Sequence, residues 1–156
     1  MLWWDSRGLP DGVQVSEADV GAVKGRRRLT RGSYLVYPCA AIATEGLCVF
    51  SPAIIAKHVY ENTAGLLAAC ATNQTGRFIY CSSMARYGRG KPPFREDQTP
   101  APVDPYGIAK YAAELLVANV GNKQGLRYGT DVPPNITGPL SEETRVGKGG
   151  RFRESA

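Results

Sequence analysis

An acidic residue and a proline directly before an apolar stripe constrain the fold of this chain more than any other feature. Asp104 and Pro105 suit the N-cap and the first position of a helix. The apolar residues that follow recur at the spacing of one helical face: Ile108, Tyr111, Ala112, Leu115 and Leu116. The pattern predicts a helix from Pro105 to about Val120, with Gly121 at its end.

Three short apolar runs, at 34–39, 77–82 and 126–132, are typical of buried strands. A second helix is predicted between the first two runs, from Pro52 to about Ala71, with Ser51 as its N-cap. Strands that alternate with helices indicate an α/β fold with a parallel sheet. Because a right-handed crossover joins neighbouring strands in such sheets, we expect the first two runs to be adjacent and parallel.

The net charge of the chain resides in one segment. The sequence has 156 residues and a formal net charge of +5. Lys24–Arg31 holds five basic residues and no acidic one, so the remainder is balanced. Such a run either holds phosphate or nucleic acid or, more commonly, forms a solvated surface or loop segment. It contains no aromatic residue to stack on bases, and we predict no nucleic-acid partner.

The sequence offers little for a metal site, a disulfide framework or a membrane span. Its four cysteines form no CxxC pair and it has one histidine, so we expect buried free thiols and no metal. No uninterrupted apolar stretch reaches the roughly 18 residues that a membrane span needs, and the N-terminus lacks the pattern of a secretion signal. We therefore expect a cytoplasmic protein without a membrane partner.

Tyr106 and Lys110 are four residues apart in the helix predicted from Pro105, so both side chains project from one face. An ammonium near a phenol stabilises the phenolate and lowers the tyrosine pKa from its usual value of about 10. Such a tyrosine can act as a general acid or base. By itself the pair is better explained as a surface lysine beside a half-buried tyrosine, and the surrounding motifs shift the balance to the catalytic interpretation.

Several motifs surround this pair in a defined order: RFIYCSS at 77–83, Tyr87-Gly88, Pro93-Phe94, DPYGIAK at 104–110 and PPNITGP at 133–139. Over residues 77–139 the sequence resembles the extended short-chain dehydrogenase/reductases, and within them the NAD-dependent nucleotide-sugar epimerases and dehydratases of the UDP-glucose 4-epimerase type. The resemblance implies a Rossmann-like doubly wound parallel sheet, NAD as cofactor and a UDP-sugar substrate with hydride transfer at C4. It also implies a homodimer formed through the helix of Tyr106 and the helix before it.

The resemblance further implies roles for single residues. Ser83 would hydrogen-bond the reacting sugar hydroxyl, and Tyr106 would exchange its proton. Lys110 would bind the nicotinamide ribose and lower the pKa of Tyr106. Asn135 would contact the substrate, and Pro134 would lie at the nicotinamide end of the cofactor.

Upstream of residue 77 the resemblance is looser. Ala40 and Ala41 resemble the strand end that passes under the cofactor, and Asp19 resembles the acid of the pair that meets the adenine. Ordinary strand-end packing and a loop acid explain these three residues equally well.

The chain departs from the family pattern in its first part. It contains no GxxGxxG turn, whose helix N-terminus binds the pyrophosphate in such folds, and it has no counterpart of the first strand. We therefore expect a partial, truncated Rossmann-like epimerase domain at 34–139, between a poorly ordered segment at 1–33 and a flexible tail at 140–156.

Without the glycine turn we expect the chain to bind NAD weakly. We also expect an inactive relative of the family rather than a working enzyme. One alternative is a non-catalytic remnant that serves as an interaction module, using Lys24–Arg31 on an anionic partner. Another is a sugar-nucleotide dehydratase, although dehydratases typically place Thr-Asp-Glu where this chain has Ser83-Met84-Ala85.

Overall fold

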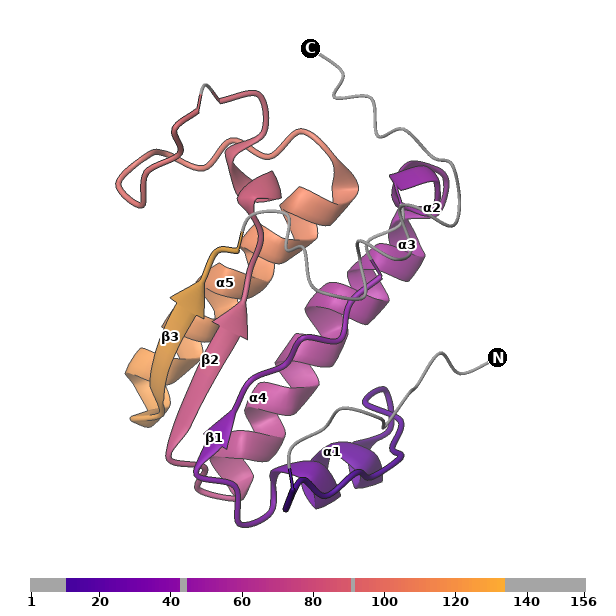
Figure 1. Ribbon diagram of the computed structural model, residues 1–156, viewed down its shortest axis with the longest axis vertical. Helices are drawn as coiled ribbons and strands as arrows, with labels where there is room; N and C mark the ends of the chain where they lie inside the picture. The colour runs from indigo at the N-terminus through magenta and orange to yellow at the C-terminus, as the bar shows by residue number, and fades with distance from the viewer. Residues whose placement is uncertain (1–10, 43–44, 91, 134–156) are drawn as a thin grey trace.

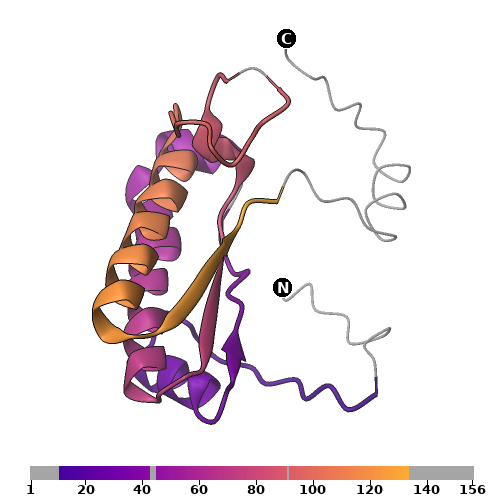
Figure 2. The same ribbon diagram turned by 90° about the vertical axis from the view of Figure 1, so that its left-hand side faces the viewer.

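Helices pack on one face of a three-stranded parallel sheet in the computed structural model, which describes residues 11–42, 45–90 and 92–133 (Figures 1 and 2). The strands are β1 (Leu35–Val36), β2 (Arg77–Cys81) and β3 (Arg127–Asp131), in the order β1-β2-β3. The predicted α/β class and the parallel pairing of the first two strands are confirmed. Only two residues of the run at 34–39 form ladder pairs, so β1 is shorter than predicted.

The strand register decides which side chains face the helices. Val36 pairs with Phe78, and Phe78 pairs with Tyr128. Because side chains alternate between the two faces of a strand, Phe78 and Tyr80 point to the helices while Ile79 and Cys81 point away. The exposure follows this alternation, since Phe78 and Tyr80 are buried and the other two are partly exposed.

The helical elements follow the chain in the order α1 (Val23–Thr30), α2 (Glu45–Phe50), α3 (Pro52–Ile55), η1 (Ala56–Glu61), α4 (Asn62–Thr72), η2 (Met84–Tyr87) and α5 (Pro105–Gln124). The predicted second helix is present as the continuous run α3–η1–α4, whose middle segment η1 is a π-helix. Ser51 lies at its N-cap as predicted, but its side chain makes no capping hydrogen bond.

The start of α5 agrees with its sequence signals and its end does not. Asp104 accepts a hydrogen bond from the Gly107 backbone N–H at 2.9 Å, and Pro105 occupies the first helical position. The helix continues past the predicted stop at Gly121 and ends at Gln124. It is capped by Gly125, whose φ of 70° lies in the left-handed region that favours glycine. Gly121 lies buried inside the helix. A Cβ at this position would collide with the ring of Tyr128, so only glycine fits there.

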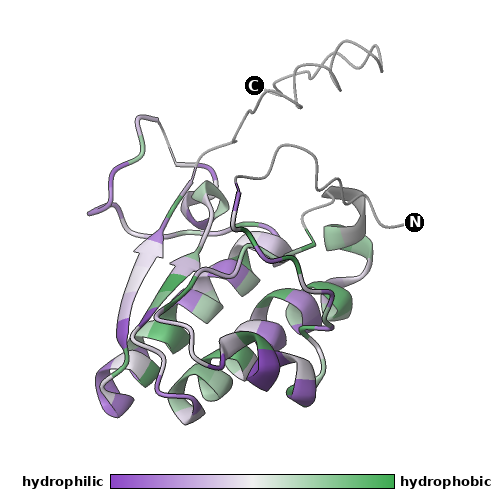
Figure 3. Cartoon of the chain, turned by 60° about the horizontal axis from the view of Figure 1, so that its bottom comes forward, coloured by the Kyte–Doolittle hydropathy of each residue, from purple (hydrophilic) through white to green (hydrophobic). Residues whose placement is uncertain are grey.

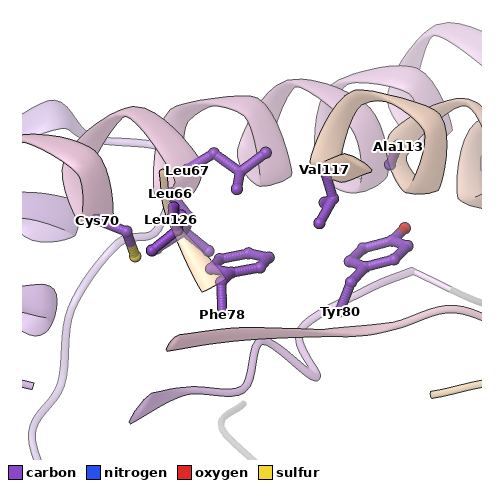
Figure 4. Close-up of a cluster of buried hydrophobic side chains, with 8 residues drawn as sticks. All are labelled: Leu66, Leu67, Cys70, Phe78, Tyr80, Ala113, Val117 and Leu126. Atoms are coloured by element: carbon purple, nitrogen blue, oxygen red, sulfur yellow. The ribbon is translucent and has the colours of Figure 1, made fainter. Parts of the chain in front are cut away.

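The core lies between the helix-facing side of β2 and the two long helices, as the close-up shows (Figure 4). Its buried members are Leu66, Leu67 and Cys70 from α4, Phe78 and Tyr80 from β2, Ala113 and Val117 from α5, and Leu126 before β3. Figure 3 shows that β2 carries apolar residues, whereas β3 has hydrophilic residues at both of its ends. Truncating a side chain like Phe78, which is fully buried, costs about 3–5 kcal/mol in cores of this kind.

Helix α1 was not among the elements that the sequence predicted. It contains seven of the eight residues of Lys24–Arg31, in a part of the chain for which we expected little order. Arginine, lysine and leucine are good helix formers, and α1 is tied to the end of α4. There the Asn73 side-chain N–H donates to the Arg27 carbonyl at 2.9 Å and to the Thr30 hydroxyl at 2.8 Å.

No helix formed by the described residues is long and apolar enough to cross a membrane. The expected tail at 140–156 lies outside the residues that the structure describes. The proposed domain boundaries at residues 33 and 139 remain predictions.

Gly121→Ala is expected to destabilise the fold by about 1–3 kcal/mol, because the new methyl group overlaps the Tyr128 ring. Replacing an ordinary glycine inside a helix by alanine stabilises the fold instead, since alanine has the higher helix propensity. Urea denaturation of the variant and the parent measures the difference. Asn119→Ala, at an exposed position of the same helix, is the matched control, and stabilisation by both substitutions would contradict the close contact.

Candidate functional site

The carboxyl ends of β2 and β3 and the first turns of α5 lie towards the same end of the molecule (Figure 1), while β1 ends beside the start of β2. Open α/β sheets bind their ligands at this end of the strands. Ser83 follows β2 and caps η2, with its hydroxyl accepting a hydrogen bond from the Ala85 N–H at 3.2 Å. Tyr106 and Lys110 lie in the first two turns of α5, one turn apart.

Lys110 is a buried cation with an exposed fraction of 4%. Its Nζ donates to the carbonyl oxygen of Cys81 at 2.5 Å, and it lies 5.3 Å from the ring centroid of Tyr80 and 5.7 Å from that of Tyr106. A carbonyl and two aromatic faces are suitable surroundings for a desolvated ammonium. Burial still lowers the pKa of Lys110, while the thiols of Cys81 and Cys39 raise it to a lesser extent.

The pKa of Tyr106 differs from the sequence-based expectation. The Tyr106–Lys110 spacing predicted a pKa lowered towards neutral pH, but in the structure the pKa of Tyr106 is raised above its ordinary value. The main cause is burial, which disfavours the phenolate, and hydrogen bonding with the Ser83 side chain acts in the opposite direction. Desolvation therefore outweighs the stabilisation that the spacing alone predicted.

The structure thus brings Ser83, Tyr106 and Lys110 together, as expected. The Ser83 side chain lies close enough to Tyr106 to lower its pKa, and Lys110 lies against the Tyr106 ring. All three side chains lie around the carboxyl end of β2. The catalytic roles that the resemblance implied for them remain proposals.

A polar layer behind these residues was not identified from the sequence. The Ser82 hydroxyl donates to Glu114 at 3.1 Å, and Glu114 forms an ion pair with Arg86 at 2.8 Å. The Arg86 guanidinium also lies over the Tyr111 ring at 5.5 Å from its centroid. These contacts fasten η2 to α5 and so fix the turn that carries Ser83. Glu114 lies four residues after Lys110, and this helical spacing was the available signal.

The other predicted site residues are less clearly placed. Ala40 and Ala41 follow β1 and are exposed. Asp19 precedes α1, and its carboxylate accepts a hydrogen bond from the Gly21 N–H at 2.7 Å, which is the behaviour of a loop acid. Pro134 and Asn135 lie outside the described residues.

A cavity of about 580 Å³ lies beside η2 and the end of β3. Its lining includes two arginines, Arg86 and Arg95, and the rings of Tyr87 and Phe94, which stack with centroids 5.1 Å apart. Met84, the residue after Ser83, is part of the same wall. Within the described part of the chain, no group of three His, Cys, Asp or Glu side chains is placed to hold a metal ion.

The buried lysine predicts a specific dependence of stability on pH. Because the pKa of Lys110 is lower in the folded chain than the ordinary 10.5, the folded state releases this proton first as the pH rises. The unfolded state then binds more protons, so the free energy of unfolding rises towards pH 10.5. Lys110→Met removes this rise.

Urea denaturation between pH 7 and pH 10.5 measures the effect as the stability difference between Lys110→Met and the parent. This difference should move in favour of the parent as the pH increases. Lys123→Met, at an exposed position of α5, controls for the loss of a surface charge. A pH-independent difference for Lys110→Met would show that the ammonium is solvated rather than buried.

The sequence profile of the NAD dependent epimerase/dehydratase family matches residues 6–149. UDP-glucose 4-epimerase of Azospirillum brasilense is 27% identical over 124 residues, which make up 76% of this chain and 35% of that protein. UDP-arabinose 4-epimerase 1 of Arabidopsis thaliana is 28% identical over 144 residues, which make up 87% of this chain and 34% of that protein. The chain spans 26% to 39% of the length of the curated relatives compared.

Solved structures show the same likeness. UDP-glucose 4-epimerase of Brucella ovis in complex with NAD is 30% identical with a TM-score of 0.70, over 74% of this chain and 36% of that one. UDP-glucose 4-epimerase of Thermotoga maritima with UDP-glucose is 26% identical with a TM-score of 0.73, over 81% of this chain and 42% of that one. The expected partial Rossmann-like fold is confirmed.

Proposed function

Because the chain belongs to the NAD dependent epimerase/dehydratase family, we propose that Ser83, Tyr106 and Lys110 perform the proton chemistry of a UDP-sugar 4-epimerase. The observation that supports this assignment is the convergence of the three side chains at the end of β2. NAD is the cofactor of the family, and the Brucella ovis relative was solved in complex with it.

The described residues fit the nicotinamide ribose of this cofactor. An ammonium has three N–H donors, and among the described residues the Cys81 carbonyl accepts one hydrogen bond from Lys110. Ribose hydroxyls are suitable acceptors for the others. Ala40 and Ala41 are exposed at the end of β1, and their methyl side chains leave space for a flat ring. Pro134 is proposed to complete this surface, and Asp19 to meet the adenine.

The proton steps fall to Tyr106. When protonated, its hydroxyl is set to donate to the C4 oxygen of a keto sugar. When deprotonated, it accepts the proton of the C4 hydroxyl. Burial raises the pKa of Tyr106 and opposes this state, and the Ser83 side chain, which lowers the pKa, favours it. The Lys110 ammonium lies on the Tyr106 ring and stabilises the phenolate electrostatically. NAD, when bound, supplies the hydride acceptor and donor for C4.

The cavity beside η2 is the proposed substrate site. It adjoins Ser83 through Met84, and its lining carries both signs of charge, Arg86 and Arg95 with Glu96 and Asp131. Arg86 is paired with Glu114 and Arg95 with Asp97, so a sugar nucleotide would bind them in competition with these carboxylates. The stacked rings of Tyr87 and Phe94 provide an apolar wall. Asn135 is proposed to contact the same ligand.

Tyr106→Phe tests the assignment, because it removes the proton-transferring oxygen and keeps the ring. The 156-residue chain is titrated calorimetrically with NAD and assayed with UDP-galactose in a coupled reaction. Loss of general acid–base catalysis should lower kcat by about 10²–10⁴ with little change in NAD affinity. Tyr111→Phe, five residues further along α5, is the matched control and should retain kcat. A parent chain that turns over UDP-galactose with the same kcat as Tyr106→Phe would contradict the role of Tyr106.

We expect NAD to bind this chain weakly. The sequence has no GxxGxxG turn, and each charge-assisted hydrogen bond missing from the pyrophosphate costs about 1.5–3 kcal/mol. Loss of two or three such bonds weakens binding by roughly 10²–10⁶. Micromolar affinity for NAD would contradict this expectation and indicate a different pyrophosphate site.

A non-catalytic interaction module is the second candidate, and the surface of α1 favours it. Lys24, Arg27 and Arg28 are exposed there, together with Arg31 at the helix end. Four exposed cations can bind an anionic partner electrostatically. A folded chain that does not bind NAD at millimolar concentration would support this module against the epimerase.

A homodimer in the cytoplasm is part of the proposal. Apolar side chains on α5 and on the neighbouring segments α3 and η1 are exposed, with exposed fractions of 39% to 54%: Ile54, Tyr60, Ile108 and Leu115. A second copy of the chain would cover them. Light scattering should give twice the chain mass, and Leu115→Arg should give the monomer, whereas Lys123→Glu should leave the dimer intact.

A further inference from the structure

Two cysteines lie near each other beside the carboxyl end of β2. Cys81 is the last residue of β2, and Cys39 lies three residues beyond β1, whose ladder with β2 ends at the pair Val36–Phe78. Cys81 alternates with the helix-facing residues of β2, so it lies on the face of the sheet away from α4 and α5. Because Cys39 follows a strand that pairs with β2, the chain carries its thiol towards Cys81, and the influence of Cys81 on the pKa of Cys39 agrees with this placement.

The Cys81 thiol lies close enough to Cys39 to affect it. Burial raises the pKa of Cys39 and the neighbouring Cys81 thiol raises it further, while the Lys110 ammonium opposes this effect. Each thiol otherwise makes a long contact to a backbone oxygen, Cys39 to Tyr37 at 3.8 Å and Cys81 to Ser82 at 3.9 Å. Such contacts are weak, so they do not hold the sulfurs apart.

Access differs between these thiols and the other two. Cys39 is exposed and Cys81 is partly exposed, while Cys48 and Cys70 are buried. The Tyr37 hydroxyl donates to Asp131 across β2 on the same face, and this bridge borders the pair on the β3 side. A small oxidant can therefore reach Cys39 from solvent, with Cys81 beside it as the resolving thiol.

We propose that Cys39 and Cys81 form a redox-sensitive pair that hydrogen peroxide closes to a disulfide beside Ser83, Tyr106 and Lys110. The raised pKa keeps most of Cys39 as the thiol, so the reaction proceeds slowly through its minor thiolate form. This thiolate attacks the peroxide, so that an S–O bond forms, the O–O bond breaks and hydroxide leaves as water after protonation. The Cys81 sulfur then attacks the sulfenic sulfur, the S–S bond forms and a second water leaves. The two sulfurs lose two electrons in total, and the peroxide gains them.

The pair is coupled to the candidate site through one residue. The carbonyl of Cys81 accepts the hydrogen bond from Lys110, and Ser83 lies two residues further along the chain. A bond from the Cys81 sulfur to β1 therefore constrains the peptide that holds the ammonium. Formation of the disulfide is independent of the proposed reaction, whereas its effect on catalysis rests on that proposal.

Peptide mapping tests the pairing. The reduced full chain is treated with hydrogen peroxide, alkylated and digested without reductant using trypsin and a glutamate-specific protease. Cleavage after Glu45 separates Cys39 from Cys48, and cleavage after Arg77 separates Cys81 from Cys70. The expected product is the peptide 32–45 linked to the peptide 78–86, with a mass two hydrogens below their sum. Dithiothreitol should restore both free peptides.

Cys39→Ser and Cys81→Ser should each abolish this product, with circular dichroism confirming that both variants are folded. In the Cys39→Ser chain, Cys81 should remain mostly reduced. The inference is overturned if Cys39 accumulates as sulfinic acid while Cys81 stays free in the parent chain. A link between two chains, or to Cys48 or Cys70, overturns it as well.

The coupling has a separate readout that does not require activity. Limited acetylation of the oxidised and reduced chains measures the reactivity of Lys110 against the exposed Lys123. Oxidation should change this ratio by about twofold or more, because the reactivity of an amine follows its pKa and its hydrogen bonding. An unchanged ratio in a chain that carries the disulfide would show that the pair does not act on the site.

Discussion

A buried ammonium holds the candidate site together. Lys110 is 4% exposed and donates to the Cys81 carbonyl at 2.5 Å. A charge taken out of water destabilises a fold unless nearby dipoles compensate it, and here a strand carbonyl and two tyrosine rings do so. Because this hydrogen bond joins α5 to the last residue of β2, it determines how Tyr106 on the helix lies relative to Ser83 after the strand.

The two faces of β2 have different surroundings. Phe78 and Tyr80 pack against α4 and α5 and form the centre of the core. The alternate residue Cys81 faces away from the helices, towards Cys39 and the Tyr37–Asp131 hydrogen bond. Parallel sheets usually bury both faces, whereas the helices of the described chain cover one. The uncovered face therefore presents reactive and polar groups at the same strand ends that carry the candidate site.

Local signals predicted the elements well where one residue type explains one structural feature. Asp104 and Pro105 mark the start of α5, and the apolar runs at 77–82 and 126–132 contain β2 and β3. Prediction was poorer where a contact between residues distant in the sequence determines whether a helix forms or where it ends. Gly121 looked like a helix stop but accommodates the Tyr128 ring, and α1 is tied to Asn73, more than forty residues further along the chain. Neither contact has a signature in the neighbouring sequence.

The sequence by itself determined that Tyr106 and Lys110 share a helix face, because an i, i+4 spacing is a local property of the helix. It also determined that Ser83 follows a strand, since the apolar run ends there. Only the tertiary structure decided the electrostatics: the pKa of Tyr106 is raised, Lys110 is bound to the Cys81 carbonyl, and Cys39 lies beside Cys81. The physical reason is that desolvation and hydrogen bonding depend on every group that surrounds an atom, and these groups come from β1, β2 and α5 at once.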